Sequence, residues 1–244
     1  MLAILNKEIQ SFFATPIGYL VIGIFLVVSG LFLFVFTGEY NILDSGFATF
    51  KPFFNMAPWI FIFLIPAISM KSFSEEQKLG TMELLLTKPL SIAKLIFGKY
   101  LGALLLVILA IVPSVIYVIC ISELGRTPGN FDLGATLGSY LGLLFLSGCY
   151  TAIGIFSSSL TKNQIVAFII AVFICFLSFF LFEGISGLSI FEAPEYGIEY
   201  FGISYHYRSI SRGVVDTRDL IYFLSFIALF LKLTHFRIKN LRNN

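Results

Sequence analysis

Long apolar stretches alternate with shorter polar ones along the whole chain. A helix needs about 20 apolar residues, within a range of roughly 17–25, to span the hydrocarbon core of a bilayer. Five stretches are long enough, whereas the last is shorter and contains Lys232, whose side chain can extend to the interface. The pattern predicts an all-α integral membrane protein with six transmembrane helices in one domain, residues 1–244. The six stretches are 17–36, 53–70, 97–121, 135–156, 165–182 and 220–233.

Residues 1–16 carry a different pattern, with apolar side chains at the spacing of one helical face. Polar residues such as Lys7 and Gln10 fall on the opposite face, which is typical of a helix that lies in the membrane interface. Thr15 and Pro16 separate this helix from the first span, because proline suits the first turn of a helix. The alternative is a frayed polar terminus, which the regular apolar stripe disfavours. The stripe consists of Leu2, Leu5, Ile9, Phe12 and Phe13.

The polar segment 71–96 predicts a second short amphipathic helix, between the second and third spans. Ser74 and Gln77 have the spacing of a capping box, so this helix is expected to begin at Ser74. A following proline should end it near Leu86, and Ser91 is expected to cap the helix that becomes the third span. Two interpretations stay open: a passive helix resting on lipid headgroups, or a docking element for a cytoplasmic partner. The apolar face comprises Leu79, Met82, Leu85 and Leu86.

The segment 183–219 is too long for a simple turn between the last two spans. It is rich in aromatic residues, whose apolar rings and polar tips favour the membrane–water interface. These features predict short re-entrant or interfacial helices, broken near Pro194 and Gly213. An ordinary folded cap on the outer face is an equally weighted alternative. The aromatic residues are Phe191, Tyr196, Tyr200, Phe201, Tyr205 and Tyr207.

The composition agrees with a membrane protein. Of the 244 residues, 58% are hydrophobic and 12% are charged, whereas soluble domains carry about 25% charged residues. A soluble chain of this length could not hide so much apolar surface in one core, so lipid must form part of its solvent. The three cysteines lie inside apolar stretches, which predicts a packing role and neither a disulfide nor a zinc site. They are Cys120, Cys149 and Cys175.

Basic residues set the orientation, because Lys and Arg accumulate in short cytoplasmic segments. With the N-terminus inside, 11 of the 16 basic residues lie on the cytoplasmic side, and ten of the 14 acidic residues lie outside. Both ends of the chain are therefore expected in the cytoplasm. The cytoplasmic basic residues are Lys7, Lys71, Lys78, Lys88, Lys94, Lys99, Lys162, Lys232, Arg237, Lys239 and Arg242.

Chemically reactive patterns are scarce in this sequence. It has no G-x-x-x-x-G-K-[ST] motif, and no polar segment is long enough to hold an ATPase. His206 and His235 stand alone near opposite membrane faces, so we interpret them as interfacial residues and not as metal ligands. The span interiors lack the ionisable residues that proton-coupled transporters place there. The pair Glu75-Glu76 falls in a predicted surface helix, which disfavours an intramembrane protease of the glutamate type.

Residues 73–89 (FSEEQKLGTMELLLTKP) resemble the loop that follows the second span in ABC-2 type permeases. The N-terminal helix that ends before Pro16 resembles the interfacial elbow helix of that family. Residues 212–216 (RGVVD), which precede the last span, also resemble the family's sequence there. With six spans and both ends inside, the resemblance covers the whole chain. Within the family, the sequence is most similar to the gliding-motility-associated permease subunits of the GldF type.

The resemblance implies a permease subunit of an ATP-driven exporter, with the type V exporter-like fold, in a bacterial inner membrane. Two permeases, identical or different, would pair among the membrane lipids. Each would receive a cytoplasmic ATPase subunit that holds ATP and Mg²⁺, so this chain would need no cofactor and catalyse no reaction itself. A non-transporting membrane scaffold and a membrane-embedded enzyme are the rivals, and no nucleic acid partner is expected. The loop motif and the apolar helix face together give the residues expected to couple to the ATPase: Glu75, Glu76, Leu79, Gly80, Thr81, Met82, Glu83 and Leu86.

Overall fold

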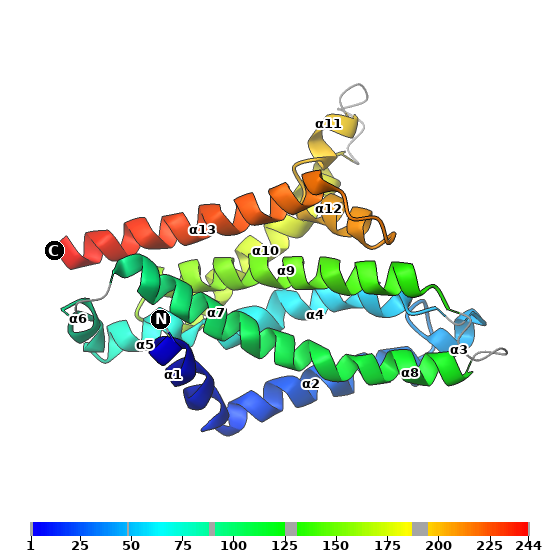
Figure 1. Cartoon of the computed structure of the whole chain (residues 1–244), viewed down its shortest axis with the longest axis horizontal. Coiled ribbons are helices and arrows are strands. Elements are labelled where there is room, and N and C mark those ends of the chain that lie inside the picture. Colours follow the sequence, from blue (N-terminus) through cyan, green and yellow to red (C-terminus); the bar gives the residue numbers. More distant parts are fainter. Residues whose placement is uncertain (1, 48, 88–90, 125–130, 187–194, 244) are drawn as a thin grey trace.

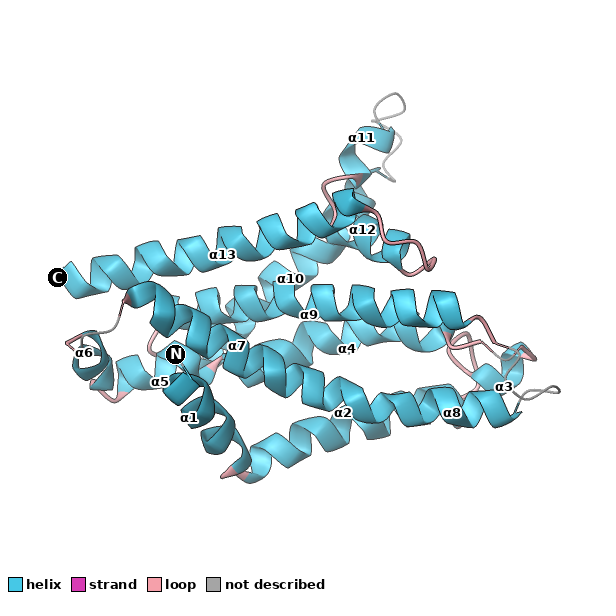
Figure 2. Cartoon of the chain, viewed as in Figure 1, coloured by secondary structure: helices cyan, strands magenta, loops and turns pink. Residues whose placement is uncertain are grey.

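The structure is a computed structural model that describes residues 2–47, 49–87, 91–124, 131–186 and 195–243. These residues form helices and no strand, with long helices bundled side by side and short ones at both ends (Figure 1, Figure 2). The expected all-α class is confirmed. In chain order the elements are α1 (Leu2–Phe13), α2 (Pro16–Phe34), α3 (Ile42–Ser45), α4 (Lys51–Ser69), α5 (Lys71–Lys78), α6 (Thr81–Leu86), α7 (Ile92–Ile111), the 3₁₀ turn η1 (Val112–Ser114), α8 (Val115–Leu124), α9 (Leu133–Leu160), α10 (Gln164–Ser186), α11 (Glu195–Glu199), α12 (Ile203–Ile210) and α13 (Thr217–Asn243).

Within the described residues, five helical stretches are long and apolar enough to cross a membrane. α4 runs on into α5, and α7 runs through η1 into α8, so each pair forms one stretch. α1 and α2 meet at an angle of 69° and together would make a sixth, in agreement with the six expected spans. Ser91 caps α7 as predicted, because its side chain accepts a hydrogen bond from the backbone N–H of Lys94 at 3.4 Å. The five stretches are Lys51–Lys78, Ile92–Glu123, Leu133–Leu160, Gln164–Ser186 and Thr217–Arg242.

The bend between α1 and α2 follows from the residues around Pro16. Thr15 is extended, and its hydroxyl donates to the carbonyl oxygen of Phe12 at 3.1 Å. A Cβ atom at Gly18 would lie 2.7 Å from that same carbonyl oxygen, so only glycine lets the two helices approach so closely. α1 keeps the expected polar face on its exposed side, where Lys7 lies.

α9 is the central helix of the bundle. It packs against α4, α10 and α13, and also against α5, α7 and α12. The close approach to α4 depends on Gly154, where a Cβ atom would fall 1.9 Å from the hydroxyl oxygen of Ser69. The hydroxyls of Ser147 and Thr151 donate to carbonyl oxygens four residues earlier in α9, at 2.6 and 2.7 Å. Both side chains are fully buried, as is typical of small polar residues at close helix contacts in membrane proteins.

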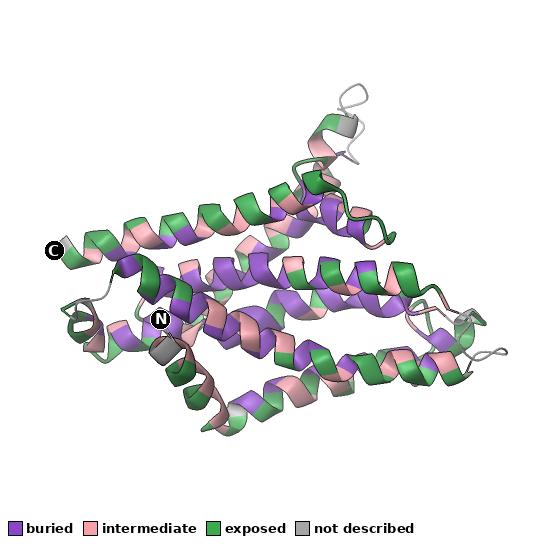
Figure 3. Cartoon of the chain, viewed as in Figure 1, coloured by how far each residue is buried: buried purple, intermediate pink, exposed green. Residues whose placement is uncertain are grey.

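The peripheral helices expose apolar surface. Buried residues concentrate along α9, whereas exposed ones follow α13 and α2 (Figure 3). In α10 the most apolar window is only 22% buried, and large side chains such as Ile165 and Phe173 point away from the protein. Soluble proteins rarely expose large contiguous apolar surfaces, so these faces suit an apolar environment such as lipid.

The long segment after α10 contains two short helices, α11 and α12. α12 packs against α9, α10 and α13, so the segment combines the expected short helices with the alternative of a folded cap. Gly213, whose φ is +87°, lets the chain turn after α12, close to the break expected there. Pro194, the other expected break, lies outside the described residues. The buried residues of α12 are Ile203, Ser204, His206, Tyr207 and Ile210.

His206 is not the lone interfacial residue that the sequence suggested. It is buried in α12, where its Nδ1 lies 2.6 Å from Oδ1 of Asp219 and its Nε2 lies 2.9 Å from the carbonyl oxygen of Tyr200. Its ring also stacks on that of Tyr222, with the ring centroids 3.9 Å apart. The expectation that His206 stands alone was wrong because Asp219 and Tyr222 meet it only through the packing of α12 against the start of α13.

Candidate coupling site

The segment predicted to couple to an ATPase begins as a continuation of a membrane-crossing helix. α4 ends at Ser69 and α5 begins at Lys71, and the two form one helical stretch. Gly80, whose φ is +71°, then ends α5 in the left-handed conformation that glycine adopts without strain. α6 follows directly, so the single helix expected from Ser74 to Leu86 is in fact two helices. A rigid extension of α4 therefore ends in a sharp turn.

The expected capping box at Ser74 and Gln77 is wrong. Ser74 is buried inside the continuous helix, and its hydroxyl donates to the carbonyl oxygen of Met70. Gln77 reaches across to α9, where its amide donates to the carbonyl oxygens of Ser158 and Ser159 at 3.4 and 3.1 Å. These carbonyls lie in the last turn of α9 and have no partner within that helix. The spacing of Ser74 and Gln77 wrongly suggested a capping box, because such a box requires the start of a helix. Nothing between α4 and α5 interrupts the helix here.

The residues predicted to face the ATPase do not share one environment. Leu79 is 67% exposed and stands next to the turn at Gly80. Thr81 is half-buried, and its hydroxyl donates to the carbonyl oxygen of Glu76 at 3.4 Å, which holds α6 against α5. Leu86 belongs to α6, but its side chain lies outside the described part of the chain. The predicted residues that are exposed are Glu75, Leu79, Gly80 and Glu83.

Met82 does not face outward as a partner-binding residue should. It is 5% exposed and belongs to the hydrophobic core of this chain. Because the turn at Gly80 rotates α6 relative to α5, the face that a continuous helix would present to a partner is turned inward at Met82. Leu84, which is 65% exposed, stands on the outer face of α6 instead.

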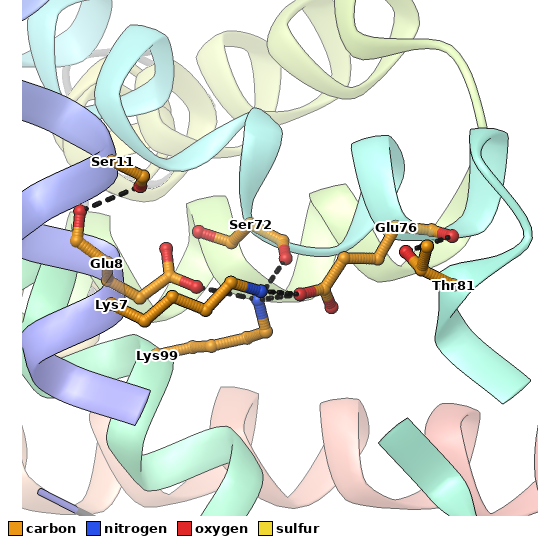
Figure 4. Close-up of polar contacts among 7 residues, drawn as sticks. All are labelled: Lys7, Glu8, Ser11, Ser72, Glu76, Thr81 and Lys99. Carbon is orange, nitrogen blue, oxygen red and sulfur yellow. Dashed lines mark hydrogen bonds and ion pairs between the residues drawn. The ribbon is translucent and has the colours of Figure 1, made fainter. Parts of the chain in front are cut away.

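Glu76 is also turned inward, into a charged junction formed by Lys7, Glu8, Glu76 and Lys99 (Figure 4). Nζ of Lys99 lies 2.8 Å from Oε1 of Glu8 and 3.0 Å from Oε1 of Glu76. The same ammonium group donates to the carbonyl oxygen of Ser72 at 2.5 Å. Nζ of Lys7 lies 3.2 Å from Oε1 of Glu76. The charged junction thus joins α1, α5 and α7.

Lys99 is the centre of the charged junction. Its side chain is only 2% exposed, and a buried ammonium group is costly unless it is paired. An ammonium group has three N–H donors, and here three acceptors from α1 and α5 lie within reach. The ring of Phe73 lies 5.1 Å from Nζ, at the distance of a cation–π contact. Removing one partner of a buried ion pair costs about 3–5 kcal/mol, because it leaves an uncompensated charge.

Three members of the charged junction, Lys7, Glu8 and Lys99, were absent from the predicted site. One signal was present in the sequence, because Lys99 is a charge in the first turn of the apolar stretch 97–121, next to the membrane, and such a charge gains from a partner. The identity of that partner could not be inferred, since Glu8 is 91 residues away along the chain. Only the packing of α1 against α7 brings the two together.

A cavity of about 530 Å³ opens beside the charged junction. Lys7 and Glu76 contribute charged groups to its wall. Leu79, which directly follows α5, and Leu84 in α6 contribute apolar side chains. The exposed leucines at its edge offer a partner an apolar contact next to the groups that join three helices. The cavity thus places exposed apolar side chains beside ion pairs that join three helices.

The helical bundle, its apolar outer faces and its bent N-terminal pair of helices define a multi-pass membrane protein. Residues 2–235 match a family model described as ABC-2 family transporter protein, and the chain belongs to this family. It is therefore a permease component of an ABC transporter, and membership in the family implies association with an ABC ATPase subunit. No curated protein matches the sequence.

Proposed function

We propose that this permease couples a separate cytoplasmic ATPase to export across a bacterial inner membrane, with α5 and α6 as the coupling segment. The charged junction carries the proposal, because Lys99 ties α5 to both α1 and α7. An ATPase that binds ATP and Mg²⁺ and closes against α5 and α6 would move the tied helices together. Rigid-body shifts of packed helices are an established way to transmit such a change.

The exposed leucines support contact with the ATPase at this position. Leu79 and Leu84 are 67% and 65% exposed and flank the turn at Gly80. Burying a leucine side chain at an interface contributes about 1.5–3 kcal/mol. Glu75 and Glu83 are exposed on the same segment and would contribute polar contacts around the leucines.

The proposal extends to the assembly around this chain. A second permease, identical or different, completes the transporter, because the resemblance to ABC-2 type permeases implies a pair. A role in gliding motility rests on the sequence resemblance alone. A membrane scaffold that neither transports nor uses ATP is the alternative function.

The test is co-purification of the ABC ATPase from native membranes, with tagged wild-type and variant chains at matched expression. Leu79→Asp and Leu84→Asp each place a charge in the proposed contact, and each should lower ATPase retention by about tenfold or more. Leu43→Asp is the matched control, because Leu43 is 57% exposed in α3, which lies at the other end of the bundle (Figure 1).

Three outcomes decide between the functions. Loss of the ATPase from both coupling variants, with retention in Leu43→Asp, supports coupling through α5 and α6. If Leu79→Asp and Leu84→Asp both retained the ATPase and full transport activity, the segment formed by α5 and α6 would be a passive surface. If the wild-type chain purified without any ATPase and kept its cellular function in cells depleted of ATP, the membrane-scaffold alternative would be favoured.

A further inference from the structure

A second cavity, of about 690 Å³, lies at the other end of the bundle from the charged junction. Residues at the start of α4, at the start of α9 and at the end of α12 line it. Figure 1 shows these helix ends away from α5 and α6. α5 follows the opposite end of α4, so no residue of the proposed coupling segment lines this cavity. The family match and the coupling proposal assign it no role.

The floor of this cavity is aromatic and firmly held. Phe50 and Phe54 are buried, and their rings meet edge to face with centroids 5.1 Å apart. The hydroxyl of Tyr207 donates to the carbonyl oxygen of Phe54 at 2.7 Å, which fixes α12 to α4. Burial raises the pKa of Tyr207 far above its usual range, so the phenol keeps the proton that it donates. Phe131 and Ala135 line the same cavity and are partly exposed, so accessible apolar surface adjoins this fixed floor.

The backbone around Arg212 is held against α9. The hydroxyl of Ser139 donates to the carbonyl oxygen of Ser211 at 3.2 Å. On the other side of Arg212, a Cβ atom added to Gly138 would lie 2.7 Å from Cα of Gly213, so the two backbones touch. The backbone of Arg212 is therefore held in a fixed position at the edge of the cavity.

The rim of the cavity carries an excess of positive charge. Lys51, Arg208 and Arg212 line it, against one carboxylate, that of Asp132. Asp132 is already engaged, because its Oδ1 accepts a hydrogen bond from the backbone at the start of α9 at 2.9 Å. Arg208 pairs with Glu183 at 2.5 Å. By contrast, neither Lys51 nor Arg212 forms an ion pair with any residue that the structure describes.

We propose that this cavity binds the phosphate group of an anionic amphiphile. Lys51 and Arg212 would contact the phosphate oxygens, since guanidinium and ammonium groups form strong charge-assisted hydrogen bonds with phosphate. The aromatic floor would receive the apolar chain attached to that phosphate. A zwitterionic headgroup brings its own cation, which the basic rim repels. Inorganic phosphate has the charge but leaves the apolar floor unused.

Binding is measured with the purified full-length chain in a neutral maltoside detergent, by calorimetric titration. The probes are a short-chain phosphatidylglycerol, the matching phosphocholine lipid and inorganic phosphate. The anionic lipid should bind about tenfold or more tightly than either of the other two. Because no ATPase is present, failure of this experiment leaves the coupling proposal untouched.

Two variants separate charge from shape, with folding checked by elution profile and melting temperature. Arg212→Glu should weaken binding of the anionic lipid by about tenfold. Arg218→Glu is the matched control, because Arg218 is exposed in the same part of the chain but does not line the cavity. Thr136→Trp keeps every charge but fills the cavity, so it should weaken lipid binding and affect inorganic phosphate less.

Several results would overturn the proposal. Equal affinity for the phosphocholine lipid would show that the basic rim does not select the headgroup. Inorganic phosphate binding as tightly as the anionic lipid would remove the role of the aromatic floor. If Arg212→Glu and Arg218→Glu lost equal affinity for the anionic lipid, general surface charge and not the cavity would explain its binding.

Discussion

Lys99 joins three helices through one ammonium group. Its acceptors belong to Glu8 in α1 and to Glu76 and Ser72 in α5, while its own backbone is part of α7. Charged contacts are stronger in a buried site than at the surface, because the effective dielectric constant is lower. A displacement of α5 that left α1 behind would have to break such contacts. The charged junction therefore favours movement of the three helices as one unit.

Lys99→Met tests the energy held in the charged junction. It leaves the buried carboxylate of Glu76 and the partly buried one of Glu8 without their shared cation, so we expect a loss of stability of about 3–5 kcal/mol. Denaturation of the purified protein in detergent measures this loss. Lys94→Met is the matched control, because Lys94 is an exposed lysine in the same helix, and its replacement should change stability little.

A double variant distinguishes a lost ion pair from a general packing defect. If pairing is the cause, Glu76→Gln should cost less in the Lys99→Met background than in the wild type, since the carboxylate there has already lost its partner. Additive effects of the two substitutions would show that Lys99 and Glu76 do not stabilise one another.

At the scale of helices, the turn at Gly80 decides what the coupling segment exposes. Its φ of +71° separates α5 from α6 and leaves Leu79 on the surface while Met82 enters the core. No atom lies within 4 Å of a Cβ built on Gly80, so space is not the constraint. The constraint is backbone conformation, because residues with a Cβ disfavour the left-handed region by roughly 1–2 kcal/mol.

Gly80→Val should therefore lower coupling without affecting insertion of the chain into the membrane. Gly80→Asn should be milder, because asparagine tolerates the left-handed region better than other residues. Gly80→Pro should be the most severe of the three, since proline fixes φ near −65° and cannot adopt +71°. The measurement is the amount of ATPase retained at matched expression.

The matched control for these variants is Gly23→Ala. Gly23 lies inside α2 and also has open space around its Cβ position, but its backbone is helical, so alanine should be neutral or slightly stabilising. If Gly80→Val retained as much ATPase as Gly23→Ala, the turn at Gly80 would not matter for coupling.

The helices could largely be predicted from the sequence, because their signals are local. Apolar length marks the spans, and Ser91 begins α7 as its position before an apolar stretch suggests. The spacing of Ser74 is an equally local signal, but the continuous helix overrules it. The pairing of Lys99 with Glu8 and the burial of Met82 could not be predicted, since both depend on how separate helices pack.

At the scale of the whole molecule, both ends of the chain lie at the same end of the bundle as α5 and α6 (Figure 1). α13 has 27 residues, which corresponds to about 40 Å at 1.5 Å per residue. The hydrocarbon core of a bilayer is only about 30 Å thick, so the last turns of α13 extend beyond a membrane-crossing length. These turns carry Arg237, Lys239 and Arg242, the kind of residues that accumulate on the cytoplasmic side.

The orientation of the molecule can be tested with reporters that work on one side of the membrane only. A fluorescent protein fused after Asn244 should be active, and alkaline phosphatase at the same position should be inactive, because we expect both ends in the cytoplasm. Phosphatase inserted near Glu195, before α11, should be active instead. A second fluorescent fusion before Met1 controls for the N-terminal side. If the C-terminal phosphatase were active while the N-terminal fusion still fluoresced, α13 would not cross the membrane. The basic turns that follow its apolar stretch would then lie on the side away from α5 and α6, which their charge disfavours.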